Sequence, residues 1–347
     1  MRRPLGSDGP EVTTIGLGSW AMSGPYVFGW GPADDDESIA AIRHAVESGV
    51  NWVDSAPVYG FGHAEEVVGR ALEPFRPGED VLVLTKCGRR WTHGRDGTEI
   101  HFDLRPDSIR EDCEASLRRL RVERIDLYQV HWPDYGTGTP IEESWGTMAE
   151  LVDQGKVRWV GVSNFTIPLL ERCERIRHVD SLQPPFSLLS RHAREELVPW
   201  CRANGTGVIV YSPMASGLLT GTFSLDRLAP DDWRRRAPAF QEPKLGQALG
   251  FVERLRAVAN RVGVSLPELA VAWVLAVSGV TAATVGARRA AQVDSWLAAG
   301  SVDLPLRELE EIERAIEETG AGTTDPSPPP GVTGEQIAAL AGASPRG

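Results

Sequence analysis

Short apolar runs recur along the chain, and each is followed by a segment with helical periodicity. Eight such runs occur, at residues 12–18, 51–55, 81–86, 125–131, 157–163, 179–183, 207–212 and 281–286. Strands that are apolar on both faces and alternate with amphipathic helices are typical of a parallel sheet covered by helices. Eight strand–helix units in about 300 residues favour an α/β protein with a (β/α)8 barrel over two doubly wound halves.

Helix-start and helix-stop signals lie between these runs. They predict helices over 34–47 and 106–120, the second opened by a proline in its first turn. Ser265 and Glu268 form a capping box before another apolar helix. The interval after the seventh run is the longest, with a loop rich in Pro, Arg and Asp and then two helical segments. We therefore expect long loops at the carboxyl-terminal face of the barrel, where such loops are commonly functional.

The two ends of the chain differ in what they can bury. Residues 1–319 carry the strand and helix patterns and are predicted to form one barrel domain. From Gly320 the stretch GAGTTDPSPPPGVTG has few side chains that could join a core. We therefore predict that residues 320–347 form a flexible tail rich in Pro and Gly.

Composition excludes several classes of protein. The 36 basic and 48 acidic residues give a net charge of −12, which provides no diffuse positive field for nucleic acid. No window approaches the ~20 apolar residues of a membrane span, and the N-terminus lacks the apolar run of a signal peptide. The four cysteines form no Cys-x-x-Cys pair and are typical of reduced thiols. We expect a soluble, cytoplasmic protein, monomeric or homo-oligomeric, with no nucleic-acid or membrane partner.

Polar side chains end the apolar runs, at the point where parallel barrel strands converge on one mouth. The second predicted strand ends in Asp54, and Tyr59 follows it in the turn DSAPVYG. Lys86 ends the third run and His131 the fourth. Taken singly, Asp54 fits a turn residue, Tyr59 a half-buried aromatic and His131 a core histidine. Lys86 is harder to explain in this way, because the chain has only 3 lysines beside 33 arginines.

A carboxylate, a phenol, an ammonium and an imidazole at one mouth suit proton donation to a carbonyl oxygen. An ammonium stabilises phenolate, so we expect Lys86 to lower the pKa of Tyr59. Asp54 would hold Lys86 charged and in place, and His131 would donate a hydrogen bond to the substrate oxygen. None of these side chains can supply a hydride, so a nicotinamide cofactor is implied.

Seven motifs resemble the aldo-keto reductase family, in the same order along residues 12–318. They are GLGSW at 16–20, DSAPVYG at 54–60, LTKCG at 84–88, YQVHWPD at 128–134, GVSNF at 161–165, YSPMASGLLTG at 211–221 and VGARRAAQ at 285–292. The resemblance implies a (β/α)8 barrel that uses NAD(P)H to reduce aldehydes or ketones. It also implies a catalytic tetrad of Asp54, Tyr59, Lys86 and His131, with histidine at the last position as in carbonyl-reducing members.

The same resemblance implies where the cofactor binds. Ser163, Asn164 and Gln183 would hydrogen-bond the carboxamide near Asp54, Tyr211 would stack on the nicotinamide, and Ser19 and Trp20 would lie across it. The pyrophosphate would lie along Ser212, Pro213, Met214, Ala215, Ser216, Gly217 and Leu218. The adenosine phosphate end would be held by Gly286, Arg288 and Gln292. An arginine there suits a 2′-phosphate, so NADPH (as NADP+ when oxidised) is favoured over NADH; the alternative for Arg288 is a solvated helix start.

Three positions depart from the family pattern at the adenine end. Thr222 replaces a common lysine, and Ser295 and Trp296 replace an acidic residue and an asparagine. The arginines at 234–236 could supply the missing charge by folding over the cofactor, but a solvated charge run is the favoured interpretation.

A second glycine motif imitates a different fold. Gly16-x-Gly18-x-x-Ala21 with nearby acidic residues looks like a Rossmann fingerprint. That motif requires a helix directly afterwards, whereas turn residues rich in Gly and Pro follow here. We therefore do not interpret it as a cofactor site.

Aromatic residues near the predicted mouth indicate a pocket for a medium-sized carbonyl compound, such as a sugar-derived or aromatic one. Arg89, Arg90 and His93 could meet an anionic substrate or lie on the surface. The predicted substrate pocket comprises Trp20, Phe28, Tyr59, Trp91, His131 and Trp132.

Two other classes of function stay open. The barrel could hold NADPH without catalysis and act as a redox sensor through a protein partner. It could also be a metal hydrolase that uses His63, His93, His101 or His131. These histidines lack a paired spacing such as His-x-His, so no metal site is expected.

Overall fold

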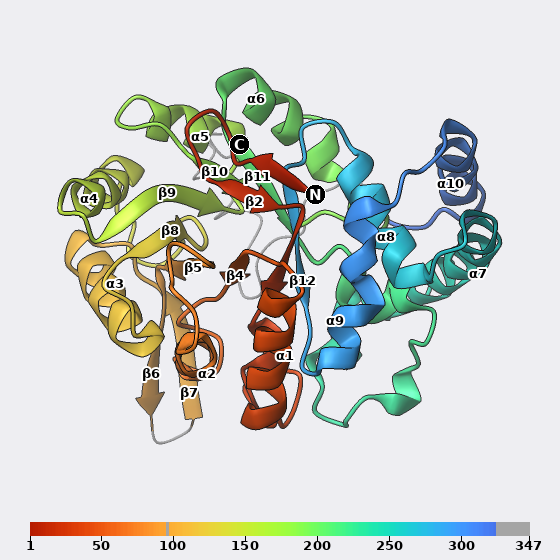
Figure 1. Cartoon of the computed structure of the whole chain (residues 1–347), viewed down its shortest axis with the longest axis horizontal. Coiled ribbons are helices and arrows are strands. Elements are labelled where there is room, and N and C mark those ends of the chain that lie inside the picture. Colours follow the sequence, from red (N-terminus) through yellow and green to blue (C-terminus); the bar gives the residue numbers. More distant parts are fainter. Residues whose placement is uncertain (95–96, 324–347) are drawn as a thin grey trace, which may run out of the picture.

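The computed structural model describes residues 1–94 and 97–323, and eight parallel strands in it close into a barrel (Figure 1). The barrel strands are β3 (Ile15–Gly18), β4 (Trp52–Asp54), β5 (Leu82–Cys87), β8 (Ile125–Val130), β9 (Val157–Ser163), β10 (Ser181–Gln183), β11 (Gly207–Tyr211) and β12 (Ala282–Gly286). Around the barrel they follow the order β10-β11-β12-β3-β4-β5-β8-β9. Each predicted run contributes one strand, which confirms the (β/α)8 barrel.

Side chains along each barrel strand alternate between the barrel interior and the surrounding helices. In β5, Leu82 and Leu84 belong to a small interior cluster, whereas Val83 and Cys87 belong to the larger core between strands and helices. Both faces of each strand are therefore buried, which explains why the runs are apolar throughout.

The amino-terminal end of the barrel interior is closed by a short antiparallel hairpin of β1 (Arg2–Pro4) and β2 (Glu11–Thr13). Leu5 and Val12 pack there in the interior cluster with Trp52. The predicted run 12–18 is therefore wrong at its start. Val12 belongs to β2, and the barrel strand begins at Ile15.

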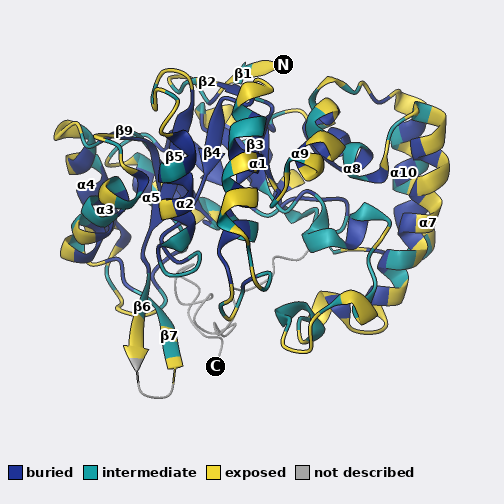
Figure 2. Ribbon diagram, turned by 60° about the horizontal axis from the view of Figure 1, so that its bottom comes forward, coloured by how far each residue is buried: buried dark blue, intermediate teal, exposed yellow. Residues whose placement is uncertain are grey.

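Helices surround the barrel, and most of them bury one face and expose the other (Figure 2). The exception is α8 (Leu266–Ala276), in which every residue from Leu269 to Leu275 is buried. The helices begin where the sequence signals them: the Asp34 carboxylate accepts the Glu37 backbone N–H at 2.9 Å, and the predicted Ser265–Glu268 capping box forms. Each such cap stabilises its helix by about 1 kcal/mol. The helices are α1 (Asp35–Glu47), α2 (His63–Leu72), α3 (Pro106–Leu120), α4 (Ile141–Asp153), α5 (Ile167–Glu174), α6 (Leu197–Asn204), α7 (Lys244–Val262), α8 (Leu266–Ala276), α9 (Ala290–Leu297) and α10 (Leu306–Thr319).

Two insertions interrupt the regular alternation. A projecting hairpin of β6 (Arg89–Gly94) and β7 (Gly97–Phe102) follows β5, so the helix expected after this strand begins only at Pro106 (Figure 1). After β11, a run of 3-10 turns from Ala215 to Phe240 precedes the two predicted helices, α7 and α8. α10 lies against α7 on the outside of the barrel (Figures 1 and 2).

The glycine motif after β3 is explained by packing. A Cβ at Gly16 would lie 2.1 Å from the Trp52 indole, so the glycine makes room for this ring. The 3-10 turn η1 (Trp20–Met22) follows, and the next α-helix begins at Asp35. As expected, no helix N-terminus directly follows Gly18 to receive a pyrophosphate.

The described part of the predicted tail is short. Ala321 is buried, and Thr323 exchanges backbone hydrogen bonds with Leu189 and Arg191 at 3.1 and 3.0 Å. Residues 324–347 of the predicted tail lie outside the described residues.

Among the described helices, none by itself has the length and apolar character that crossing a membrane requires. Only α7 and α8 together reach these criteria, as a pair bent by 85°.

Candidate active site

A layer of buried polar side chains lies where the barrel strands end. The Lys86 ammonium donates to Asp54 Oδ2 at 2.6 Å and to the Ser55 carbonyl at 2.9 Å. The other carboxylate oxygen of Asp54 accepts from the amides of Gln183 at 3.1 Å and Gln129 at 3.3 Å. Lys86 is 0% and Asp54 3% exposed, so this ion pair is withdrawn from water. Each of its charges has further hydrogen bonds, as a buried pair requires.

Tyr59 and His131 lie above this ion pair. Lys86 Nζ is 5.4 Å from the centre of the Tyr59 ring, and the His131 ring meets the same ring edge to face at 5.8 Å. The His131 Nδ1 atom is buried without a hydrogen-bond partner among the described residues. The structure thus brings together all four residues of the predicted tetrad.

The electrostatics of this group differ from the sequence expectation in one respect. The pKa of Tyr59 is raised well above its usual value, because the hydroxyl is desolvated and faces the negative charge of Asp54. The net pKa shift of Tyr59 in the protein alone is therefore upward, opposite to the lowering that was expected from Lys86. Burial also lowers the pKa of Lys86, although the charges of Asp54 and Glu65 oppose the effect.

His131 is held in its neutral form. Burial lowers its pKa well below the usual 6.5, and the positive charges of Lys86 and Arg89 act in the same direction. A neutral imidazole keeps one N–H donor and one acceptor nitrogen. It can therefore donate a hydrogen bond without carrying a charge.

The predicted carboxamide ligands form one connected network. Asn164 Nδ2 donates to the His131 carbonyl at 3.0 Å and to Ser163 Oγ at 2.9 Å, and its Oδ1 accepts from the Tyr211 hydroxyl at 2.8 Å. Ser163 Oγ donates to the Gln183 carbonyl at 2.7 Å. Asn164 adopts a left-handed φ of 64°, which directs its side chain across three strand ends. The network ties His131 and Tyr211 into fixed positions.

Aromatic rings form one wall of the mouth, and Trp20 is at its centre. The Trp20 indole N–H donates to the Tyr26 hydroxyl at 2.9 Å and the Phe28 carbonyl at 3.1 Å. Its ring lies 6.4 Å from the Tyr59 ring. Nearby, the predicted cofactor residue Ser19 is fully buried and donates to Ser55 Oγ at 2.8 Å.

The predicted pocket residues Phe28 and Trp91 join this wall through two other rings. Phe28 contacts Tyr26 at 6.3 Å, Tyr26 contacts Phe61 at 5.6 Å, and Phe61 contacts Trp91 at 5.6 Å between ring centres. Trp132 is half-buried and makes none of the ring contacts found within the described part of the chain.

The long loop after β11 folds back over this wall. Trp233 stacks on Trp20 at 5.9 Å, and the Arg234 guanidinium lies 4.4 Å from the Trp30 ring. Arg234 also pairs with Asp232 at 2.7 Å and donates to the Ser216 carbonyl at 3.3 Å. The favoured interpretation of 234–236 as a solvated charge run is therefore wrong for Arg234, because aromatic rings and a carboxylate cover it. Arg236 is exposed, as expected.

The turn that follows Tyr211 has an unusual backbone. Ser212, Ala215 and Ser216 have left-handed φ values of 56°, 49° and 52°, and Gly217 has 101°. Such conformations cost non-glycine residues about 1–3 kcal/mol each and cluster at functional sites. Successive backbone N–H groups in turns of this kind form concave anion sites. Within the predicted pyrophosphate segment, Pro213 and Met214 lie between these residues, and Leu218 is buried beneath them.

Positive charge gathers beside this turn at the end of β12. Arg288 donates to the carbonyls of Trp30 at 3.1 Å and Pro32 at 3.4 Å. Burial lowers its pKa, and the charges of Arg289 and Arg234 add to this effect. The predicted Gln292 accepts the Arg288 backbone N–H at 2.7 Å, and the predicted Gly286 is exposed at the strand end.

Two of the positions that depart from the family pattern lie on the surface. Thr222 and Ser295 are exposed, whereas Trp296 is 1% exposed and belongs to the core under α9. Trp296 therefore has a packing role that explains its identity without an adenine contact.

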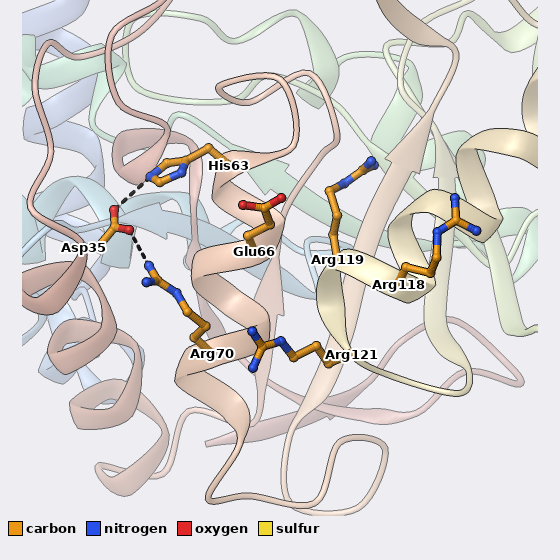
Figure 3. Close-up of a pocket in the computed structure, with 7 residues that line it drawn as sticks. All are labelled: Asp35, His63, Glu66, Arg70, Arg118, Arg119 and Arg121. Atoms are coloured by element: carbon orange, nitrogen blue, oxygen red, sulfur yellow. Dashed lines mark hydrogen bonds and ion pairs between the residues drawn. The ribbon is translucent and has the colours of Figure 1, made fainter.

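A separate cavity of about 350 Å³ lies outside the barrel between α2 and α3 (Figure 3). Asp35 accepts from His63 at 2.8 Å and pairs with Arg70 on its other oxygen. Arg119 extends from this cavity to the fully buried Glu65, whose other oxygen accepts from Thr85 at 2.6 Å. The remaining lining residues are Glu66, Arg118 and Arg121.

The histidines considered as metal ligands lie in different settings. His63 lines this outer cavity and contacts Asp35, whereas His93 is exposed and contacts Thr98 at 2.9 Å. Within residues 1–94 and 97–323, no three His, Cys, Asp or Glu side chains are grouped so that they could hold a metal ion.

Sequence reasoning missed several residues of the site. Gln129 precedes His131 by two positions, so the two side chains are expected on the same face of the strand. The alternation of strand side chains could therefore have identified Gln129 as a residue of the site. Trp233 and Phe61 had no comparable signal, because both lie in irregular segments whose paths depend on distant contacts.

Comparisons with known proteins agree with this geometry. The sequence profile described as "Aldo/keto reductase family" matches residues 14–317. The chain is 35% identical over 317 residues to the aldo-keto reductase YhdN of Bacillus subtilis (strain 168), covering 91% of this chain and 93% of that protein. It is also 35% identical over 310 residues to the NADH-specific methylglyoxal reductase of Escherichia coli (strain K12), covering 87% and 94%.

A similar solved structure supports the same relationship. The glycerol dehydrogenase AKR11B4 from Gluconobacter oxydans superposes with a TM-score of 0.82 at 35% identity. The match covers 96% of this chain and 98% of that one.

Proposed function

The chain belongs to the aldo/keto reductase family of NAD(P)H-dependent oxidoreductases, which act on small carbonyl compounds, and we propose that it reduces an aldehyde or ketone with NADPH. The observation that carries this proposal is the buried Asp54–Lys86 pair beneath the Tyr59 ring. Tyr59 is the proton donor, and His131 is the hydrogen-bond donor to the carbonyl oxygen.

The side chains across the mouth suit a dinucleotide by their donor set. Ser163 and Gln183 would hold the carboxamide, the Tyr211 ring would face the nicotinamide, and the left-handed turn from Ser212 would receive the pyrophosphate. Arg288 would bind the adenosine phosphate end. The bound nicotinamide supplies the hydride that none of these side chains can provide.

The protein's own residues carry the proton step. The raised pKa of Tyr59 keeps its hydroxyl protonated at neutral pH, so the group can act as an acid. Negative charge would develop on the carbonyl oxygen during the reduction, and the Tyr59 hydroxyl would give its proton to that oxygen. The Lys86 ammonium then faces the phenolate and stabilises it. His131 lowers the energy of the same developing charge through a neutral hydrogen bond.

Replacing Tyr59 by phenylalanine tests this assignment. Tyr59→Phe should lower kcat by ~10²-fold or more, because only the transferable proton is lost. Cofactor affinity, measured by fluorescence titration, should change little. Steady-state NADPH consumption is followed with a panel of aldehydes, keto-sugars and aromatic ketones.

Tyr128→Phe is the matched control. Its hydroxyl makes a 3.4 Å contact with the Ile109 carbonyl inside the helix–strand core, away from the mouth. Near-normal turnover in Tyr59→Phe would refute the role of Tyr59. No consumption of either nicotinamide by the unaltered protein would instead favour a non-catalytic redox sensor.

The preference for NADPH rests on Arg288. Arg288→Ala should raise the dissociation constant of NADPH by roughly 10- to 100-fold, since one charged hydrogen bond contributes about 1.5–3 kcal/mol, and should leave NADH binding nearly unchanged. The control is Arg289→Ala, because Arg289 is exposed and pairs with Glu37 at 2.9 Å. Equal weakening of both cofactors by Arg288→Ala would mean that Arg288 does not recognise the 2′-phosphate.

A further inference from the structure

Three basic residues of the β6–β7 hairpin have different environments. Arg90 is bound to Glu111 at 2.9 Å and to Asp112 at 3.3 Å. His93 is exposed at the outer end of the hairpin. Arg89 is only 8% exposed at the base of the hairpin, directly after the catalytic strand β5.

The Arg89 side chain is largely buried, and its guanidinium has no counter-ion among the described residues. It lies 4.1 Å from the centre of the Phe102 ring, to which the hairpin pairing brings it. Among the described residues it has no hydrogen-bond or ion-pair partner. Asp103, which follows the strand partner Phe102, is already paired with Arg105 at 2.6 Å.

Arg89 and Trp91 are two positions apart in β6, so they lie on the same face of the hairpin. On this face Trp91 contacts Phe61 in the aromatic wall of the mouth at 5.6 Å. The positive charge of Arg89 acts on His131 and on the Tyr26 hydroxyl, which belong to two different walls of the site. Burial lowers the pKa of Arg89 to about 10, so the side chain remains charged at neutral pH. The charge of Arg89 thus acts on the residue that is proposed to meet the carbonyl oxygen.

The position of Arg89 in the barrel separates it from the cofactor phosphates. In the closed strand order, β5 lies opposite β11, which leads into the left-handed turn proposed for the pyrophosphate. Arg288 lies at the end of β12, next to β11. A negative group that meets Arg89 would therefore belong to the substrate.

Burying an unpaired guanidinium is unfavourable unless something compensates for its charge. One ring face provides only part of that compensation. Arginine presents a planar fork of donors that matches a carboxylate with two hydrogen bonds, and a single cation balances a single negative charge.

We propose that Arg89 binds a carboxylate of the substrate, so that the preferred substrates are aldehydes or ketones that also carry a carboxylate group. This inference rests on the proposed reductase function and specifies its substrate class. Arg89 acts in substrate recognition, while Tyr59 and His131 act on the carbonyl.

Matched pairs of substrates test the proposal. One pair is 4-carboxybenzaldehyde and its methyl ester, and a shorter pair is succinic semialdehyde and its methyl ester. Within each pair the ester lacks the negative charge and carries one additional methyl group, and kcat/KM is measured with NADPH for both members. We expect the unaltered enzyme to prefer the acid by ~10-fold or more in at least one pair, as expected for a charged hydrogen bond. Arg89→Met should reduce this ratio by a similar factor, and Arg89→Lys should retain part of it.

The control variant is Arg90→Met, which removes the neighbouring guanidinium that is already paired with acids. It should keep the acid-to-ester ratio of the unaltered enzyme even if it lowers stability. A merely structural role of Arg89, through its Phe102 contact, would change both members of a pair equally and leave the ratio constant.

The outcomes separate this inference from the function on which it rests. An equal or lower kcat/KM for the acids than for the esters in the unaltered enzyme would overturn it, as would an unchanged ratio in Arg89→Met. Failure to reduce any of the four compounds, or any member of the carbonyl panel, would instead count against the reductase function itself.

Discussion

The lower and upper parts of the barrel interior are built from the same strands but have opposite chemistry. Below, Leu82, Leu84 and Leu127 form an apolar cluster with Trp52. Above, two residues further along the same strands, Lys86 and Gln129 take the inward positions, and the hydrogen bonds lead to Asp54. Side chains in both parts alternate along the strand with the same period of two. The backbone therefore directs the apolar and the polar side chains into the barrel in the same way.

This difference separates stability from function. Apolar layers stabilise the fold, because their side chains leave water without losing hydrogen bonds. The polar layer gains much less, since desolvation of an ion pair offsets its Coulomb attraction. Buried charges that add little stability are expected where they have a functional role. Here the proposed role is proton transfer at the mouth. Three variants test this comparison, in addition to those given above.

The largest effect is expected at the ion pair itself. Lys86→Met should reduce kcat by ~10²-fold or more and lower the free energy of unfolding by about 3–5 kcal/mol, because Asp54 remains buried without its cation. The measurements are steady-state kinetics and urea denaturation.

The control for this variant is Arg254→Met, which breaks the exposed Arg254–Glu318 pair. An exposed pair contributes about 0–1 kcal/mol. If both variants lost the same stability, burial would not be the reason for the importance of the Asp54–Lys86 pair.

A variant in the apolar layer should lose stability but keep most of its kcat. Leu84→Ala leaves a cavity under the polar layer and should cost about 2–5 kcal/mol of unfolding free energy. The kcat of the folded fraction should fall far less than in Lys86→Met. Leu306→Ala makes the same change at a side chain that is 71% exposed and should alter stability by less than about 0.5 kcal/mol. A large loss of kcat in folded Leu84→Ala would show that the two layers are not separable.

The smallest effect concerns pH. In the unfolded chain His131 binds a proton below about pH 6.5, whereas in the folded protein its lowered pKa keeps it neutral. The unfolded state then holds more protons, so the free energy of unfolding should fall as pH drops below 6.5, by up to about 1.4 kcal/mol per pH unit.

Urea denaturation of the unaltered protein and of His131→Asn between pH 7.5 and 5.5 measures this slope. The difference between the two proteins isolates His131, because other groups titrate in both. Asp112, whose pKa is raised to about 6 by burial, is one such group. Parallel pH dependence in the two proteins would contradict a neutral His131.

Most of the barrel could be predicted because its signals are local. The buried strands are short apolar runs in the sequence. Helices α1 and α3 begin and end close to their predicted start and stop residues, and the capping box at Ser265 forms as predicted. The β6–β7 hairpin could not be predicted in this way, because its strands are partly exposed and lack the apolar pattern of the barrel strands.

The candidate tetrad was predictable for a related reason. Asp54, Lys86 and His131 each end a run or directly follow one, and parallel strands bring their ends together. The pKa of Tyr59 was not predictable, because its sign depends on whether desolvation and the charge of Asp54 outweigh the effect of Lys86.

By itself, the sequence determined the number and order of the barrel strands and which polar side chains reach the mouth, since both follow from strand period and position. Only the tertiary structure decided which of the adjacent charged residues are covered. Arg89 and Arg90 are neighbours in the chain, yet Arg89 packs on Phe102 and Arg90 pairs with acids of α3. Burial of a side chain depends on what a distant segment places against it, and no local pattern carries that information.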